Sequence, residues 1–131
     1  MADLVVVDTD LVIDFLRGRG PGAHLTRRLV LERRLRVTAM TSFELRVGAD
    51  FLARKDQILR LFRSRTVPLD LASTLRAGEV ASTLQASGTG IGFVDCLQAG
   101  ICLRYGLPLA TRNRKHFDRV EGLQLIDVEA A

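Results

Sequence analysis

A run of four apolar residues near the N-terminus, Leu4-Val5-Val6-Val7, most strongly limits how this chain can fold. Three consecutive valines favour a β-strand, and a continuous apolar run of this length is typical of a strand buried on both faces. Strands of that kind occur mainly in parallel sheets that are covered by helices on both sides. The polar residues Asp8-Thr9-Asp10 end the run. The chain is therefore predicted to begin with a buried parallel strand.

Short apolar segments then alternate with longer segments of helical periodicity. Further strands are predicted at 35–38, 66–69, 107–110 and 123–127, and helices at 11–16, 23–33, 41–47, 51–62, 71–86 and 93–105, with a helical turn at 113–117. This alternation predicts an α/β fold, in which helices cover both faces of a short, mainly parallel sheet of four to five strands. Because 131 residues without a repeat or linker suit one domain, residues 1–131 are predicted to form a single domain.

Composition limits the environment and the partners. No apolar run approaches the roughly 18 residues that span a bilayer, and the N-terminus lacks a signal-type segment, so a cytoplasmic protein without membrane contact is expected. The net charge is +4, and 17 of the 19 basic residues are arginine. Arginine binds phosphate in two-point fashion, so a nucleic-acid partner is compatible with this charge. The absence of Trp argues against a base-stacking platform.

The two cysteines predict neither a disulfide nor a zinc site. Cys96 and Cys102 are six residues apart on one predicted helix, about 9 Å along its axis, which is too far for a mutual bridge. Neither belongs to a closely spaced pair of metal ligands. Both are predicted to be buried apolar residues.

Polar residues directly follow two of the predicted strands. Asp8-Thr9-Asp10 comes after the first strand, and Thr111-Arg112-Asn113 comes after the fourth. In parallel sheets, ligands bind beyond the carboxyl ends of the strands, where the strand order reverses. These two segments are therefore predicted to lie together at a functional site.

Three carboxylates are candidates for that site, although each also has a simple structural explanation. Asp8 can cap a helix, and Glu44 can complete a capping box that begins at Thr41. Asp95 suits the first turn of a helix, but its apolar neighbours imply a partner or a metal. Carboxylates in one cleft raise one another's pKa unless a cation neutralises them. Mg²⁺ or Mn²⁺ prefers such ligands and can activate water against a phosphodiester.

Other polar residues near these segments have simpler explanations. Asp10 and Asp14 are expected to face solvent or to cap backbone groups, and His116 is expected to be packed or hydrogen-bonded rather than a ligand. Asn113 can serve as a turn residue, with Thr111 as a cap for the turn that follows it.

Four segments together resemble the motifs of the PIN-domain ribonucleases, especially the VapC-type toxins of prokaryotic toxin–antitoxin pairs. They occur in the family's order and spacing and, with a similar ending at 119–123, cover almost the whole chain. The segments are Val7-Asp8-Thr9-Asp10-Leu11-Val12-Ile13-Asp14-Phe15-Leu16-Arg17, Thr41-Ser42-Phe43-Glu44-Leu45, Gly92-Phe93-Val94-Asp95 and Ala110-Thr111-Arg112-Asn113-Arg114-Lys115-His116-Phe117. The resemblance implies a PIN-like three-layer α/β/α sandwich.

By the same resemblance, Asp8, Glu44 and Asp95 match the family's acidic metal-binding positions. The fourth catalytic position falls on Asn113, where many members carry Asp. An amide oxygen can still ligate a metal or orient a metal-bound water, but it adds no charge. We therefore expect at most one tightly held ion in the free protein and a second one only with RNA.

The resemblance also implies supporting residues and partners. Thr9 and Thr111 are expected to assist at the cleft with their hydroxyl groups, and Arg112 and Arg114 are expected to meet the RNA backbone. The implied activity is Mg²⁺- or Mn²⁺-dependent endonucleolytic cleavage of RNA. The implied assembly is a homodimer that is inhibited by a VapB-type antitoxin.

Two other functions remain open from the sequence. One is a PIN-type nuclease that processes RNA without acting as a toxin. The other is a non-catalytic binding module, either a degenerate PIN fold or a receiver-like domain with Asp70, which follows the third strand, as its phosphoacceptor.

Overall fold

The computed structural model describes residues 3–129 and confirms the α/β class. The strands are β1 (Val5–Val7), β2 (Leu35–Thr38), β3 (Thr66–Val67), β4 (Leu109–Ala110) and β5 (Leu125–Ile126). The helices are α1 (Thr9–Arg17), α2 (Pro21–Leu31), α3 (Ala39–Val47), α4 (Phe51–Phe62), α5 (Leu71–Ala86), α6 (Phe93–Tyr105) and α7 (Arg114–Phe117).

The five strands form one parallel sheet in the order β3-β2-β1-β4-β5. Strand β1 is central, with Val5 opposite Leu35 of β2 and Val7 opposite Ala110 of β4. The chain builds the sheet outward from β1 in one direction and then returns to β1 to build it in the other. The strand order therefore reverses between β1 and β4, where the sequence predicted a site.

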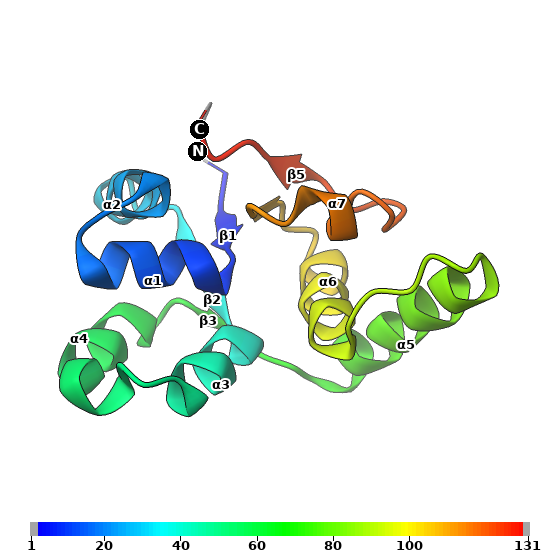
Figure 1. The fold of residues 1–131 in the computed structure, drawn as a ribbon, viewed down its shortest axis with the longest axis horizontal. Coiled ribbons are helices and arrows are strands. Elements are labelled where there is room, and N and C mark those ends of the chain that lie inside the picture. Colours follow the sequence, from blue (N-terminus) through cyan, green and yellow to red (C-terminus); the bar gives the residue numbers. More distant parts are fainter. Residues whose placement is uncertain (1–2, 130–131) are drawn as a thin grey trace.

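Helices cover both faces of this sheet, which confirms the three layers (Figure 1). Val5 and Val7 point to the face that packs against α1, α2 and α4, and Val6 points to the face that packs against α6 and α7. Helix α5 lies against α6, and the two helices touch at Gly100. A Cβ atom at Gly100 would lie 2.6 Å from the carbonyl oxygen of Ser73, so only glycine permits this approach.

The start of α3 differs from the prediction. The proposed capping box from Thr41 to Glu44 is wrong, because α3 begins at Ala39 and its cap is Thr38, the last residue of β2. The Thr38 hydroxyl accepts a hydrogen bond from the Thr41 backbone N–H at 3.3 Å. Helix α3 thus follows β2 without a loop, and the side chain of Glu44 is available for another contact.

Other boundaries shift by a few residues. Helix α2 begins at Pro21 rather than at residue 23, because proline suits the first position of a helix. The predicted strands at 66–69, 107–110 and 123–127 each contribute only two paired residues. Sequence patterns mark apolar runs, whereas strand ends depend on which backbone groups find partners.

The cysteine prediction is confirmed, since Cys96 and Cys102 are unbridged and buried. Burial raises the pKa of both thiols, so they remain protonated at neutral pH. Within residues 3–129, no helix is long and apolar enough to cross a membrane.

Candidate active site

Asp8 stands at the centre of the site, directly after β1 and at the N-cap of α1. Its carboxylate accepts hydrogen bonds from the Thr111 hydroxyl at 2.7 Å and the Gln98 side-chain amide at 3.3 Å. It also accepts the backbone N–H of Thr9 at 3.0 Å. Thr111 follows β4, so the predicted meeting of the two strand ends is confirmed.

The environment of Asp8 disfavours its negative charge. Burial, the largest cause, raises the pKa of Asp8 above its ordinary value. The hydrogen bonds from Thr111 and Thr9 oppose this effect, whereas the negative charges of Asp95 and Glu44 add to it. Asp8 therefore lies in a field of like charge that a cation would relieve.

Glu44 approaches from α3 at the exposed rim of the site. Its Oε1 accepts a hydrogen bond from the Thr9 hydroxyl at 2.6 Å. The same hydroxyl lies 3.0 Å from the buried hydroxyl of Thr41. Thr9 thus links α1 to α3 and orients Glu44.

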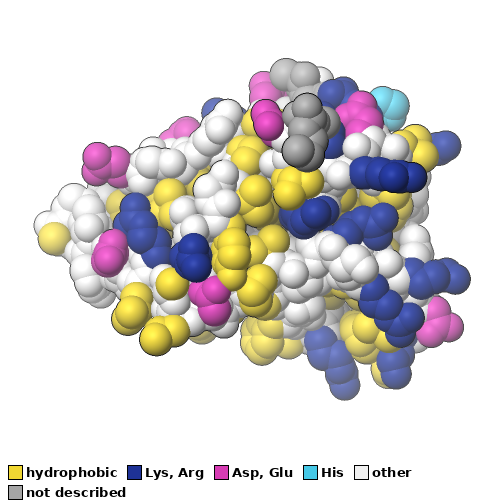
Figure 2. All heavy atoms as spheres, turned by 180° about the vertical axis from the view of Figure 1, so that it is seen from behind, with side chains coloured by type: hydrophobic (Ala, Val, Ile, Leu, Met, Phe, Trp, Pro, Cys, Tyr) yellow, Lys and Arg dark blue, Asp and Glu magenta, His cyan; other side chains and the backbone are white. Residues whose placement is uncertain are grey.

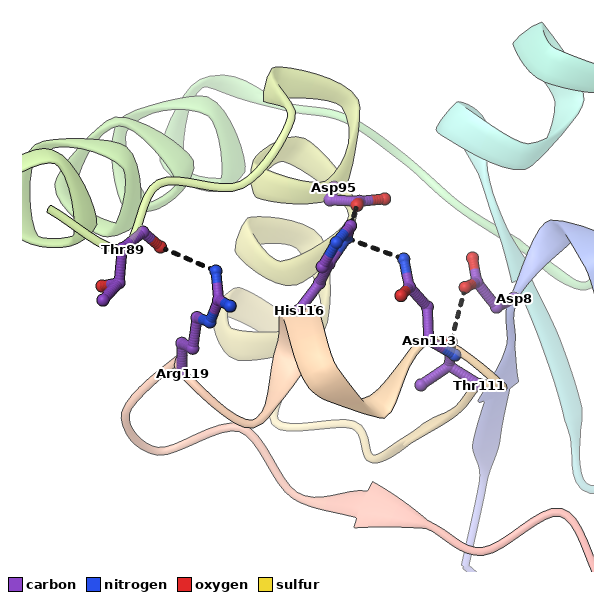
Figure 3. Close-up of polar contacts among 7 residues, drawn as sticks. All are labelled: Asp8, Thr89, Asp95, Thr111, Asn113, His116 and Arg119. Carbon is purple, nitrogen blue, oxygen red and sulfur yellow. Dashed lines mark hydrogen bonds and ion pairs between the residues drawn. The ribbon is translucent and has the colours of Figure 1, made fainter.

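Asp95 is in the first turn of α6 and is partnered by His116 of α7 (Figure 3). His116 Nδ1 lies 3.1 Å from Asp95 Oδ2 and 2.8 Å from Asn113 Nδ2. Because a carboxylate only accepts, His116 donates to Asp95 when Nδ1 carries the proton. When Nδ1 carries no proton, it accepts from Asn113 instead. His116 is therefore hydrogen-bonded, as expected, and its two partners are predicted site residues.

The loop after β4 divides its side chains between two tasks. The buried Thr111 hydroxyl accepts the Asn113 backbone N–H at 2.9 Å while it donates to Asp8, so Thr111 supports both the loop and the site. The expected helix cap at Thr111 is wrong, because the N-cap of α7 is Asn113 and no side chain caps this helix. Arg112 instead forms an ion pair with Asp14. Asp14 also accepts the backbone N–H of Gly22 at 3.1 Å, which confirms its expected capping role.

Sequence reasoning missed Gln98, which connects the buried polar groups of the site. Its side chain is 2% exposed. The amide oxygen accepts from the Thr38 hydroxyl, and the amide nitrogen donates to Asp8 and, at 3.4 Å, to Thr41. A signal was present, because Gln98 lies one helical turn after Asp95 in an otherwise apolar stretch.

The structure brings Glu44 and Asp95 close enough to Asp8 for their negative charges to help raise its pKa. Yet across residues 3–129 no three Asp, Glu, His or Cys side chains lie close enough together to enclose an ion as they stand. Oxygen ligands, nearby negative charges and a partly buried carboxylate of raised pKa suit a hard divalent cation. Closure around such an ion requires the side chains to move inward.

Residues 5–123 match the family model described as the PIN domain. The chain belongs to the PIN-domain family. This match covers β1 through α7 and includes all the site residues described above. The membership that the four motifs predicted is confirmed.

Individual PIN-domain relatives resemble the chain along nearly its full length. The tRNA(fMet)-specific endonuclease VapC of Salmonella typhimurium is 24% identical over 93% of this chain and 96% of its own length. A chain of the DNA-bound VapBC structure from the same organism superposes with a TM-score of 0.82 at 23% identity, covering 97% of this chain and 99% of that one. A chain of VapBC-1 from nontypeable Haemophilus influenzae reaches a TM-score of 0.74 at 25% identity, covering 95% and 98%.

Proposed function

We propose that this PIN-domain protein is an endoribonuclease that acts as the toxin of a VapBC-type toxin–antitoxin pair. The observation that carries the proposal is the cluster of Asp8, Glu44 and Asp95 at the point where strand order reverses. The curated relative named a tRNA(fMet)-specific endonuclease VapC supports the same reaction class. Full-length similarity to chains of VapBC complexes supports the toxin role.

We propose Mg²⁺ or Mn²⁺ as the cofactor, held by Asp8, Asp95 and Glu44. When bound, such an ion would activate water and stabilise charge on the cleaved phosphodiester. The raised pKa of Asp8 supports this assignment, because a cation would offset the charge that burial disfavours. Asn113 supplies no charge, which supports one tightly held ion and a second one only alongside RNA.

The chain's own side chains orient these ligands. Thr111 and Gln98 donate to Asp8 and fix the direction of its two oxygens. His116 and Thr9 make the corresponding contacts to Asp95 and Glu44. The neutral hydroxyl and amide donors hold Asp8 and Glu44 without removing their charge, so this charge remains available to a cation.

We propose a homodimer and a VapB-type antitoxin as the protein partners. Large apolar side chains are exposed on α3, α5 and α6, which supports an interface on that side of the molecule. They are Phe43, Val47, Leu71, Leu75 and Phe93. The solved relatives are VapBC complexes, which supports an antitoxin partner.

The alternative functions differ in how well they agree with the structure. A PIN nuclease that processes RNA without a toxin role would use the same site, and growth assays separate it from a toxin. The receiver-like module fits poorly, because Asp70 caps α5 and accepts a hydrogen bond from the Tyr105 hydroxyl, outside the acidic cluster. A degenerate PIN fold fits poorly, since three of the four acidic positions are retained.

The decisive experiment is cleavage of labelled RNA by pure protein with Mg²⁺ or with excess chelator. Asp95→Asn is expected to lose activity about a hundredfold or more, because several kcal/mol of charge stabilisation is lost. Asp118→Asn, which makes the same charge change at an exposed residue next to α7, is expected to retain activity. Full cleavage by Asp95→Asn, or cleavage that persists in chelator, would disprove the metal mechanism. The toxin role is tested by induced expression in bacteria. The parent protein is expected to arrest growth, and Asp95→Asn is expected not to.

A further inference from the structure

Two arginine-rich segments lie at the amino ends of strands β2 and β3, opposite the carboxyl ends of the strands, where the acidic cluster lies. One surrounds the start of β2 and the other surrounds the end of α4 and the start of β3. Residues 33–43 and residues 57–69 contain three arginines each and no Asp or Glu. The six residues, here called the arginine edge, are Arg33, Arg34, Arg36, Arg60, Arg63 and Arg65.

Strand pairing brings the two segments together. Strands β2 and β3 are parallel neighbours, with Val37 opposite Thr66, and the Val37 N–H donates to the Arg65 carbonyl at 3.1 Å. The Val5 N–H donates to the Arg34 carbonyl at 2.9 Å, which joins the same edge to β1. Figure 2 views the molecule from behind Figure 1 and shows Lys and Arg side chains gathered on the side of α2 and α4, with few acidic side chains among them.

The positive charge of this edge is largely uncompensated. In the part of the chain that the structure describes, Glu32 is the one carboxylate that forms an ion pair with any of the six arginines, at 2.9 Å from Arg34. Six arginines against one glutamate leave five positive charges. Because the whole chain carries four, the remainder of the molecule has a net charge of minus one. The basic character of the protein is therefore a local property of this edge.

Neutral backbone groups hold several of these guanidinium groups in place. Arg34 Nε donates to the Asp3 carbonyl at 2.7 Å, and Arg36 Nη1 donates to the Leu35 carbonyl at 2.7 Å. Arg65 Nη1 donates to the Leu61 carbonyl at 3.0 Å. A carbonyl fixes a guanidinium without cancelling its charge, and the remaining N–H groups stay free for a phosphate.

The backbone at this edge also presents an arginine at a strained position. Arg33 and Ser64 follow the ends of α2 and α4, and both have left-handed backbone conformations, with φ of 58° and 67°. Glycine usually occupies such positions, since a side chain there costs about 1 kcal/mol or more. Arg33 is exposed, so this strained backbone conformation presents a cation in the turn that follows α2.

We infer that the arginine edge is a second RNA-binding surface that contacts the sugar–phosphate backbone away from the cleavage site. The inference rests on the proposed ribonuclease function. The carboxyl ends of the strands, here called the catalytic edge, carry clustered carboxylates that repel phosphate, so additional affinity for RNA is expected from basic side chains away from that cluster. The four-residue strand β2 spans about 13 Å, so one folded RNA can touch both edges. Contacts to phosphate position RNA without reading its sequence.

The test measures binding separately from cleavage, in chelator and on an Asp95→Asn background. Fluorescence anisotropy follows labelled, unfractionated tRNA over a salt series. The edge variant combines Arg33→Gln with Arg63→Gln, both exposed and without an ion pair in the described structure. The matched control combines Arg104→Gln with Arg119→Gln, two exposed arginines without an ion pair in the described structure that lie on α6 and just after α7, away from α2 and α4. Both pairs remove two charges, and thermal melting checks that each variant is folded.

We expect the edge variant to bind tRNA more weakly and with a salt dependence that is shallower by about 1.4–1.8 in log–log slope, the effect of two lost phosphate contacts. The control should keep nearly the parent slope. Equal slopes in the two variants would overturn the inference, as would a loss confined to duplex DNA or a parent protein that does not bind tRNA. Cleavage by the active parent is measured in parallel, so the ribonuclease proposal stands or falls on its own result.

Discussion

The two edges of the sheet treat charge in opposite ways. At the carboxyl ends of the strands, Asp8 is partly buried and its negative charge is raised in energy by Asp95 and Glu44. At the amino ends of β2 and β3, exposed arginines concentrate positive charge with almost no carboxylate between them. Thus negative charge is held at one edge although burial disfavours it, and positive charge is concentrated at the other because few carboxylates lie nearby.

A common principle joins the two edges. Asp8 is held by the neutral donors of Thr111 and Gln98, and the guanidinium groups of Arg36 and Arg65 are held by neutral backbone carbonyls. Full ion pairs inside the protein would have neutralised both edges. Neutral partners fix the geometry and leave each charge free for a ligand, which would be a cation at one edge and a phosphate at the other. Both edges also carry a cost in stability, which is the disfavoured charge of Asp8 at one and the left-handed backbone of Arg33 at the other.

Removal of the charge at Asp8 is expected to change RNA cleavage and stability more than any other substitution at either edge. Asp8→Asn should reduce RNA cleavage about a thousandfold, because a central ligand charge is lost. It should also raise the Tm of the metal-free protein by a few degrees, the shift that about 1 kcal/mol produces in a domain of this size. Asparagine caps a helix as well as aspartate does, so the capping contribution is retained. Cleavage assays and thermal melts in chelator measure the two effects.

The sign of the pH dependence follows from the raised pKa of Asp8. The folded state holds this proton more tightly than the unfolded chain does, so the contribution of Asp8 to stability declines as pH rises from its ordinary pKa of 3.8 through the raised value. The Tm advantage of Asp8→Asn should therefore be present at neutral pH and shrink near pH 4. An Asn variant that is less stable than the parent at neutral pH would show that the folded protein stabilises the charge of Asp8, contrary to its raised pKa.

His116 offers a smaller test that should affect only the catalytic edge. His116→Ala removes the partner of Asp95 and is expected to reduce cleavage and Mn²⁺ affinity about 10- to 100-fold, as the loss of such supporting contacts does. His116→Asn should recover much of the activity, because its amide can occupy the place of Nδ1. His24→Ala, on the exposed side of α2, is the control. The affinity for tRNA should be unchanged in all three, and a parallel loss of tRNA binding would show that the two edges are not independent.

Sequence patterns predicted the catalytic edge better than its details. The valine run before Asp8 and the apolar strand before Thr111 are local signals, and parallel pairing brings their ends together wherever the loops run. The contact of Glu44 with Thr9 was hidden, because the apparent capping box explained Glu44 without reference to α1. Gln98 was hidden because a single polar residue in an apolar helix has many possible partners.

The arginine edge was not predictable from the sequence in the same way. Arg36 and Arg65 are far apart along the chain, and only the register of β2 against β3 makes their segments neighbours. Their neutral anchors are backbone carbonyls, which every residue carries and no pattern marks. A net charge of +4 suggested a phosphate partner but not its place. Total charge can be counted from the sequence, but the position of the charge on the surface depends on the tertiary structure.

The smallest expected effect separates binding from strain at the arginine edge. Arg33→Gly and Ser64→Gly both relieve a left-handed residue at the end of a helix, at φ of 58° and 67°. Each should stabilise the fold by about 0.5–1 kcal/mol, because the steric relief exceeds the added entropy of glycine in the unfolded chain. Only Arg33→Gly should also weaken tRNA binding and flatten its salt dependence by about 0.7–0.9, the effect of one phosphate contact. Urea unfolding and anisotropy measure the two quantities. Equal tRNA affinity in the two variants would mean that the left-handed turn at Arg33 is an accident of helix termination rather than a cost retained for RNA.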